Sequence, residues 1–77
     1  MPPLPSARPV KHSLTLRGHR TSVSLEAAFW DEFRNLASTS GRSLNDLAAE
    51  IDATRADVGL ASAIRVHVLT WLRGQIG

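Results

Sequence analysis

The feature that most constrains the fold of this chain is a change in hydrophobic period after Leu25. Residues 11–25, KHSLTLRGHRTSVSL, alternate apolar with polar side chains. The apolar positions are Leu14, Leu16, Val23 and Leu25. A period of two is typical of β-strands that bury one face and expose the other. Gly18 lies between the two alternating stretches and permits a turn, so the pattern fits a hairpin or two strands that pair separately.

From Glu26 onward the apolar spacing is helical. Phe29 and Phe33 are followed by Leu36 and Ala37, the i, i+4, i+7, i+8 spacing of one helix face. Gly41 supplies a helix stop. A second helix is indicated by Ser43 with Asp46 three residues later, as in a capping box, and a third apolar pattern begins at Leu60. We expect strands over about residues 12–17 and 20–25, and helices over about residues 27–39, 43–53 and 60–74.

The N-terminal stretch, residues 1–10, has a different composition. Its sequence MPPLPSARPV holds all four prolines of the chain. Proline lacks a backbone donor, and the stretch has no apolar period, so we expect a flexible arm there. The folded domain is therefore predicted to span residues 11–77.

Charge is distributed unevenly along the chain. The first 25 residues carry Arg8, Lys11, Arg17 and Arg20 and no acid, whereas five Arg and seven Asp or Glu follow. A basic stretch ahead of an acidic to neutral body indicates one end that faces a polyanion and one end that is structural.

Several functions are disfavoured by the composition. There is no cysteine, which excludes disulfides and thiolate metal sites. His12, His19 and His67 lack the spacing of helical metal ligands, and no nucleophile, base and orienting group recur at a recognisable spacing. No apolar run approaches the roughly 20 residues that span a bilayer. We expect no enzymatic activity, cofactor, metal or membrane association, and a cytoplasmic location.

A longer motif carries a family resemblance. Residues 20–51, RTSVSLEAAFWDEFRNLASTSGRSLNDLAAEI, combine a short polar strand, an amphipathic helix, a glycine turn and a capped helix. This order resembles the ribbon-helix-helix family of bacterial repressors and antitoxins, and GHRTSVSLEAAFW, residues 18–30, resembles a small bacterial subgroup of it. The resemblance covers residues 11–73. It implies a mainly α fold with a short β-ribbon, a homodimer with an additional C-terminal helix, and a DNA-binding regulator.

Physical arguments lead to the same expectation. A lone strand ahead of two helices exposes an unpaired edge, which a second copy of the chain would satisfy. A two-stranded ribbon is one of the few elements that fit the major groove of double-stranded DNA. If Val23 and Leu25 point inward, Arg20, Ser22 and Ser24 point outward, and we expect these three side chains to contact bases.

Phosphate contacts are expected from two parts of the chain. In the family the start of the second helix holds a DNA phosphate, and the resemblance places this role on Gly41, Arg42, Ser43 and Leu44. Free N–H groups and the helix dipole favour an anion at such a position. Lys11, Arg17 and His19 are the expected phosphate contacts of the basic stretch.

The larger apolar side chains are expected to form the core of the dimer. Aromatic residues at helical spacing with apolar neighbours indicate a core, not a platform for stacking bases. The predicted core residues are Val23, Leu25, Phe29, Trp30, Phe33, Leu36, Leu47, Ile51, Ile64, Val68 and Trp71.

Because the chain has an upstream strand, three alternatives remain for the segment that reads DNA. The segment 20–25 could read DNA while the upstream strand packs elsewhere; the upstream strand, with Lys11, Ser13, Thr15 and Arg17, could be the reader; or DNA binding could be lost. A hairpin in each chain would give a dimer four strands, too wide to lie flat in a groove about 12 Å across. We favour the first alternative, and we expect the chain to act as a repressor. The competing function is a protein-interaction module, an antitoxin or adaptor, that engages a protein partner through the third helix or the N-terminal arm.

Overall fold

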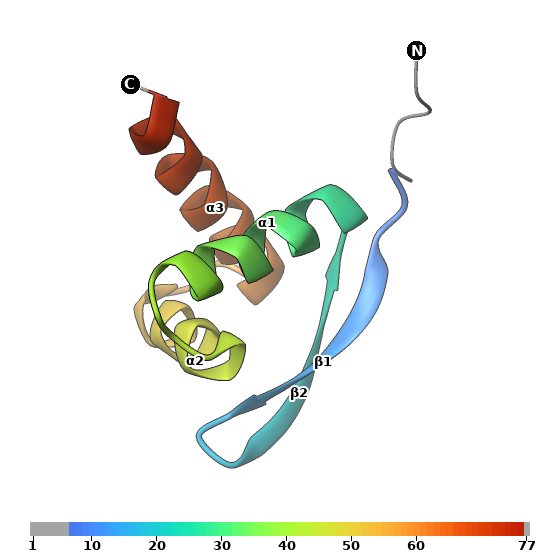
Figure 1. The fold of residues 1–77 in the computed structure, drawn as a ribbon. Helices are drawn as coiled ribbons and strands as arrows, with labels where there is room; N and C mark the ends of the chain where they lie inside the picture. The colour runs from blue at the N-terminus through green and yellow to red at the C-terminus, as the bar shows by residue number, and fades with distance from the viewer. Residues whose placement is uncertain (1–6, 77) are drawn as a thin grey trace.

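The computed structural model describes residues 7–76, in which a β-hairpin precedes three helices (Figure 1). The elements are β1 (Val10–Leu16), β2 (His19–Leu25), α1 (Ala27–Thr39), α2 (Leu44–Thr54) and α3 (Leu60–Ile76). The predicted fold class, mainly α with a short β-ribbon and an additional C-terminal helix, is confirmed. Only one chain is present, so the homodimer stays a prediction.

The two strands pair within one chain. β1 and β2 are antiparallel, with a register that runs from Leu16 opposite His19 to Val10 opposite Leu25. The turn residues Arg17 and Gly18 have φ of 52° and 85°, and positive φ at both central residues is the requirement of a type I′ hairpin turn. Of the two pairings that the sequence allowed, the structure has the hairpin.

The strand and arm boundaries differ slightly from the expected ones. β1 begins at Val10, inside the stretch expected to be a flexible arm, and ends before Arg17, because that residue belongs to the turn. Residues 1–6 of the expected arm lie outside the described residues.

α1 ends as the glycine predicts. Gly41 has φ of 69°, its N–H donates to Ser38 O over 3.1 Å, and the N–H of Arg42 donates to Ala37 O over 3.0 Å. These two bonds form a Schellman motif, which satisfies the last carbonyls of the helix. The chain then turns directly into α2.

The ends of α2 are fixed by side chains. The Ser43 hydroxyl accepts the Asp46 N–H over 3.0 Å, so the predicted N-cap is confirmed, and α2 begins one residue later than expected. After α2, Arg55 donates to Asp52 Oδ1 over 2.6 Å and to the carbonyl of Val58 over 2.7 Å. Arg55 therefore closes the turn that leads to α3.

One apolar core lies between the inner face of the hairpin and the three helices. Its largest fully buried side chains are Phe33, Leu25, Leu47, Ile64 and Val68. Among the residues predicted for a dimer core, Phe29, Trp30 and Trp71 are partly buried and the other eight are buried, all inside one chain. These residues therefore share one core within a single chain, and their contribution to a dimer stays a prediction.

α3 is anchored to the junction between the ribbon and the helices. The Arg65 guanidinium donates to both carboxylate oxygens of Glu26, over 2.9 and 3.1 Å, and lies 5.8 Å from the ring centroid of Phe29. These hydrogen bonds from Arg65, together with one from the Glu26 backbone, hold the pKa of Glu26 below its ordinary value of 4.5. Within residues 7–76 no helix is long and apolar enough to cross a membrane.

Candidate nucleic-acid interface

The outer face of the hairpin is entirely polar. Directly opposed residues of an antiparallel pair share a face of the sheet. The outer-face pairs are Lys11 with Ser24, Ser13 with Ser22, and Thr15 with Arg20, and all six residues are exposed. The opposite face carries Leu14 and Val23, which pack on the helices. The structure therefore has a ribbon with one buried face and one face of hydroxyls and cations, which we call the outer face.

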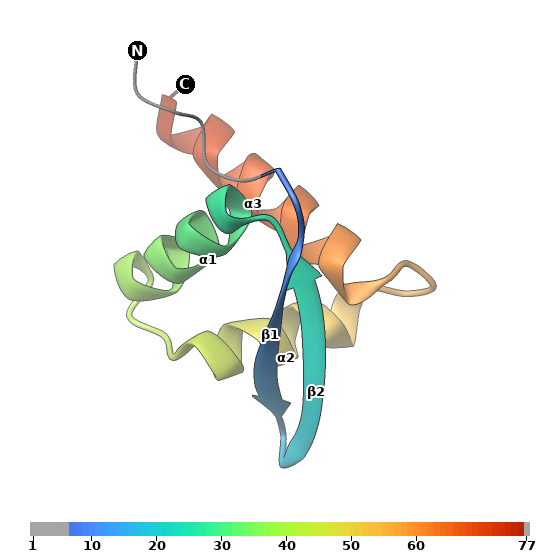
Figure 2. The same cartoon turned by 90° about the vertical axis from the view of Figure 1, so that its right-hand side faces the viewer.

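The outer face is basic and accessible. Lys11 lies near one end of the ribbon and Arg20 near the other, with Arg17 in the turn beyond it. No acidic residue occurs in either strand or in the turn. Figure 1 shows the helices on one side of the hairpin, and both views show its turn extending past α2 (Figures 1 and 2). A large polyanion can approach this face without meeting the helices.

The residues predicted to contact bases are brought together on this face. Arg20, Ser22 and Ser24 lie on it in β2, and Ser13 and Thr15, weighed as alternative readers, lie directly across from two of them. Lys11, predicted to contact phosphate, shares the same face. His19 is exposed near the turn but lies opposite Leu16, so it belongs to the inner side of the ribbon. Sequence alternation identified the outward positions of each strand but not that the two sets are adjacent.

The N-terminus of α2 lies beside β1. The backbone N–H of Thr15 donates to Asn45 Oδ1 over 3.1 Å. This bond occupies part of the outer edge of β1 and brings the first turn of α2 next to the ribbon. Sequence reasoning missed Asn45, because a polar residue in the first turn of a helix gives no signal of a partner 30 residues away.

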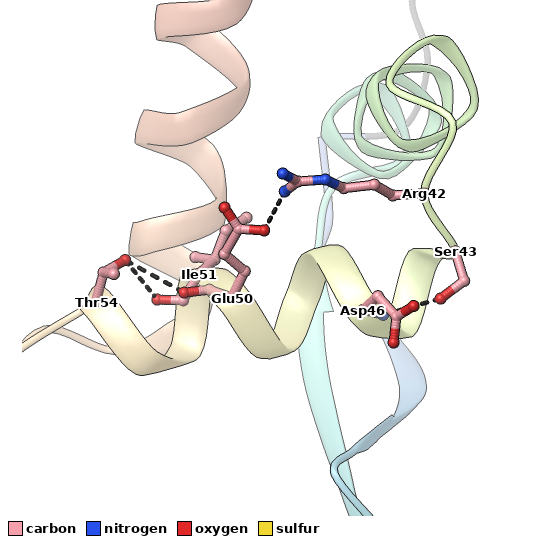
Figure 3. Close-up of polar contacts among 6 residues, drawn as sticks. All are labelled: Arg42, Ser43, Asp46, Glu50, Ile51 and Thr54. Carbon is pink, nitrogen blue, oxygen red and sulfur yellow. Dashed lines mark hydrogen bonds and ion pairs between the residues drawn. The ribbon is translucent and has the colours of Figure 1, made fainter.

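The predicted phosphate site at the start of α2 has one feature that the sequence did not indicate. Gly41 ends α1, and Ser43 caps the start of α2. The Arg42 guanidinium makes an ion pair with Glu50, two turns along α2 (Figure 3). Within the described chain the backbone N–H groups of Leu44 and Asn45 have no backbone acceptor. Such amides in a first helical turn favour an anion.

Comparison with known protein families decides the identification. A family model, the ribbon-helix-helix domain, matches residues 9–72, most of the chain. The chain belongs to the ribbon-helix-helix family. Domains of this family are commonly parts of DNA-binding regulators or antitoxins and are typically non-enzymatic. No curated protein and no solved structure matches the chain. The predicted family resemblance is confirmed.

In this ribbon-helix-helix chain the edge of β2 is open. The pair that flanks a two-residue hairpin turn is hydrogen-bonded, so the backbone groups of Arg20, Ser22 and Ser24 point away from β1. In the described part of the chain these groups have no backbone partner in another element. A cleft of about 600 Å³ lies along this edge, between β2 and the segment that joins α2 to α3.

The histidines of this ribbon-helix-helix chain are not gathered into a site. The His12 ring stacks on Trp30, with ring centroids 3.8 Å apart and planes 5° from parallel. His12 thereby covers the aromatic residues of α1 from the inner face of β1. Among the described residues no three His, Cys, Asp or Glu side chains lie close enough to hold a metal ion. The stack was not predicted, although His12 shares the alternation that places Leu14 inward.

Proposed function

We propose that this chain is a sequence-specific DNA-binding regulator of transcription, a repressor of the bacterial cytoplasm, which places the outer face of its hairpin in the major groove. The observation that carries the proposal is the outer face itself, with six exposed polar side chains on a two-stranded ribbon. Membership of a family that commonly binds DNA supports it. The partner is double-stranded DNA, and the proposal requires no cofactor.

Each polar group has a role that its chemistry supports. The Arg20 guanidinium can donate two hydrogen bonds to guanine O6 and N7, the commonest specific contact in the major groove. The hydroxyls of Ser22 and Ser24 can donate or accept, so they read bases less sharply. The proposed phosphate contacts are the start of α2, from Gly41 to Leu44, and the basic residues Lys11, Arg17 and His19.

A selection from a random duplex library, followed by titration of the selected duplex, tests the proposal. Arg20→Ala is expected to weaken specific binding by about 1–3 kcal/mol, because a bidentate base contact is lost. Log affinity of the wild type should fall with log salt by about 0.9 for each phosphate contact. Ser38→Ala, a change at an exposed position of α1, is the control. No selected sequence, or equal affinity of Arg20→Ala and wild type, would reject the proposal.

A homodimer is part of the proposal, since ribbon-helix-helix proteins typically form dimers. The strand-pairing argument for a dimer is weakened, because β1 already pairs with β2. Two surfaces could still receive a second copy: the open edge of β2, and an apolar groove of about 550 Å³ between α2 and α3. Light scattering of the purified protein measures the assembly directly.

The same groove favours a second candidate function, a protein-interaction module that acts through α3. The groove is lined by Val58 and Val66, which are 47% and 65% exposed, with Ala63 and Trp71 beside them. Removing residues 60–77 would also remove core side chains, so the test is Val66→Asp. If Val66→Asp no longer retains a partner protein in pull-downs but still binds DNA, the result would support the protein-interaction function. Unchanged pull-downs would count against it.

A further inference from the structure

We infer that the apolar groove between α2 and α3 receives α3 of a second copy of this chain, with the two α3 helices antiparallel and Arg73 of each copy beside the partner's Asp57. The inference rests on the proposed function only in its expectation of a homo-oligomer, and it names one surface of that assembly. The lining of the groove contains no residue of either strand, so this contact is separate from the ribbon.

The outward face of α3 has an apolar centre. Among the described residues four large apolar side chains are exposed, and three of them, Val58, Val66 and Leu69, lie in the groove or one turn from its lining on α3. Val66, in the middle of the helix, is 65% exposed. Ser62 and Ala63 line the groove one turn before it, and small side chains let a second helix pack closely. A clustered exposed apolar face of this kind marks an interaction surface.

Opposite charges flank this apolar face. Asp57 directly precedes Val58 at one end, and Arg73 lies one turn beyond Leu69 at the other, and both charged side chains are exposed. Neither has an ion pair among the described residues. Arg55, the cation nearest to Asp57 in the sequence, already donates to Asp52 and to the carbonyl of Val58. The face is therefore negative near the start of α3 and positive near its end.

A face with this order of groups is complementary to a second copy of itself when the two helices run antiparallel. A two-fold axis brings the same patch of both copies into contact. With the axis at Val66, Arg73 lies seven residues, or about 10 Å, along α3 from the axis. The partner's Gly59 lies level with it, two residues from the partner's Asp57. A parallel pair would instead bring like charges together at both ends.

A second copy therefore supplies both the apolar centre and the two charges that this face requires. Ribbon-helix-helix proteins typically form dimers, so self-association is in keeping with the family. Both views show the C-terminal part of α3 extending beyond the other helices, where a second helix can lie along it (Figures 1 and 2). The contact uses one helix face and the end of α2, less than the roughly 800 Å² per partner of a standard interface. We expect it to be weak and to form as the protein concentration rises.

Sedimentation equilibrium of the full-length chain over a range of concentrations tests the inference. At high concentration the mass of the wild type should reach at least twice that of Val66→Asp, because the contact would bury an unpaired carboxylate. Val66 is exposed in the single chain, so the variant should keep the wild-type fold, which its melting temperature checks. Asn35→Asp, at an exposed position of α1, is the control and should sediment like the wild type. Equal masses of wild type and Val66→Asp at every concentration would overturn the inference.

An exchange of charges tests the antiparallel arrangement. Asp57→Arg and Arg73→Asp each bring like charges together at both ends of the contact, and each should weaken the association about three- to tenfold at low salt. The double variant Asp57→Arg/Arg73→Asp restores opposite charges and should associate like the wild type. A double variant that associates no better than the single variants would overturn the proposed pairing.

Failure of this inference is distinguishable from failure of the proposed function. If the wild type selects no duplex from a random library, the proposed function is rejected, whereas the difference in mass between wild type and Val66→Asp is measured without DNA. If the masses are equal but a duplex is selected, only the α3 contact is rejected.

Discussion

At the residue scale, Glu26 links three parts of the molecule. It lies between β2 and α1 in extended conformation, with φ of −62° and ψ of 148°, and its carboxylate receives both hydrogen bonds from Arg65 of α3. A bidentate pair of this kind fixes geometry as well as charge. A single side chain therefore holds the third helix against the junction from which the ribbon leaves.

Glu26→Gln is expected to lower the melting temperature at neutral pH. The folded-state pKa of Glu26 is below its ordinary value of 4.5, so the stabilisation is present above pH 4.5 and is lost as the pH falls through the lowered pKa. Thermal unfolding at pH 7 and near pH 2 measures this dependence. The difference between variant and wild type should shrink at the acidic pH. Glu32→Gln, on α1 and without an ion pair among the described residues, is the control.

Local sequence patterns predict the residues of the outer face, but they do not predict the long-range side-chain contacts. Alternation alone predicts that Arg20, Ser22 and Ser24 face away from the core, because a strand with a period of two has only two faces. The contacts of Asn45 with Thr15 and of Glu26 with Arg65 join residues 30 and 39 positions apart. Such pairs depend on how elements pack, and no local pattern in one sequence encodes them.

At the element scale, the hairpin adds a strand to the one that the family resemblance predicts. β1 pairs with one edge of β2, and the other edge of β2 stays open. The sequence left this pairing open, because a turn at Arg17 and Gly18 and two separate strands have the same alternation. The helix ends were more predictable: the Schellman motif at Gly41 and the cap at Ser43 each depend on residues within a few positions.

The ion pair between Arg42 and Glu50 gives a prediction at the scale of the elements (Figure 3). Glu50→Gln should release the guanidinium at the start of α2 and raise the affinity for the selected duplex. The dependence of log affinity on log salt should steepen by up to about 0.9, the effect of one additional phosphate contact. Stability should change little, since both side chains are about half exposed.

Glu32→Gln makes the same change of charge on α1 and is again the control. If both variants raise the affinity equally, the effect is one of net charge. The assignment of Arg42 to a phosphate would then be wrong.

At the scale of the whole molecule, α3 completes the core. Ile64 and Val68 are fully buried beside Phe33 and Leu47. The sequence predicted which apolar side chains line one face of each helix, but it did not show that α3 packs against α1 and α2 of its own chain. That packing is a property of the tertiary structure.

Ile64→Ala is therefore expected to lower the free energy of unfolding by about 2–5 kcal/mol, through lost burial and the cavity that remains. Val66→Ala, on the same helix but 65% exposed, should change it by less than about 0.5 kcal/mol. Urea unfolding of both variants measures the two values. Equal losses would mean that α3 does not pack as described.

The most direct test of the central claim is a titration of the ¹⁵N-labelled protein with its selected duplex, followed by NMR. We expect the largest amide shift changes on both strands of the outer face, at Lys11, Ser13, Arg20 and Ser22, and at Leu44 in the first turn of α2. The amides of Val58 and Val66 should stay unchanged. Shift changes centred on the α2–α3 groove, with the hairpin unaffected, would contradict the claim that the hairpin reads DNA.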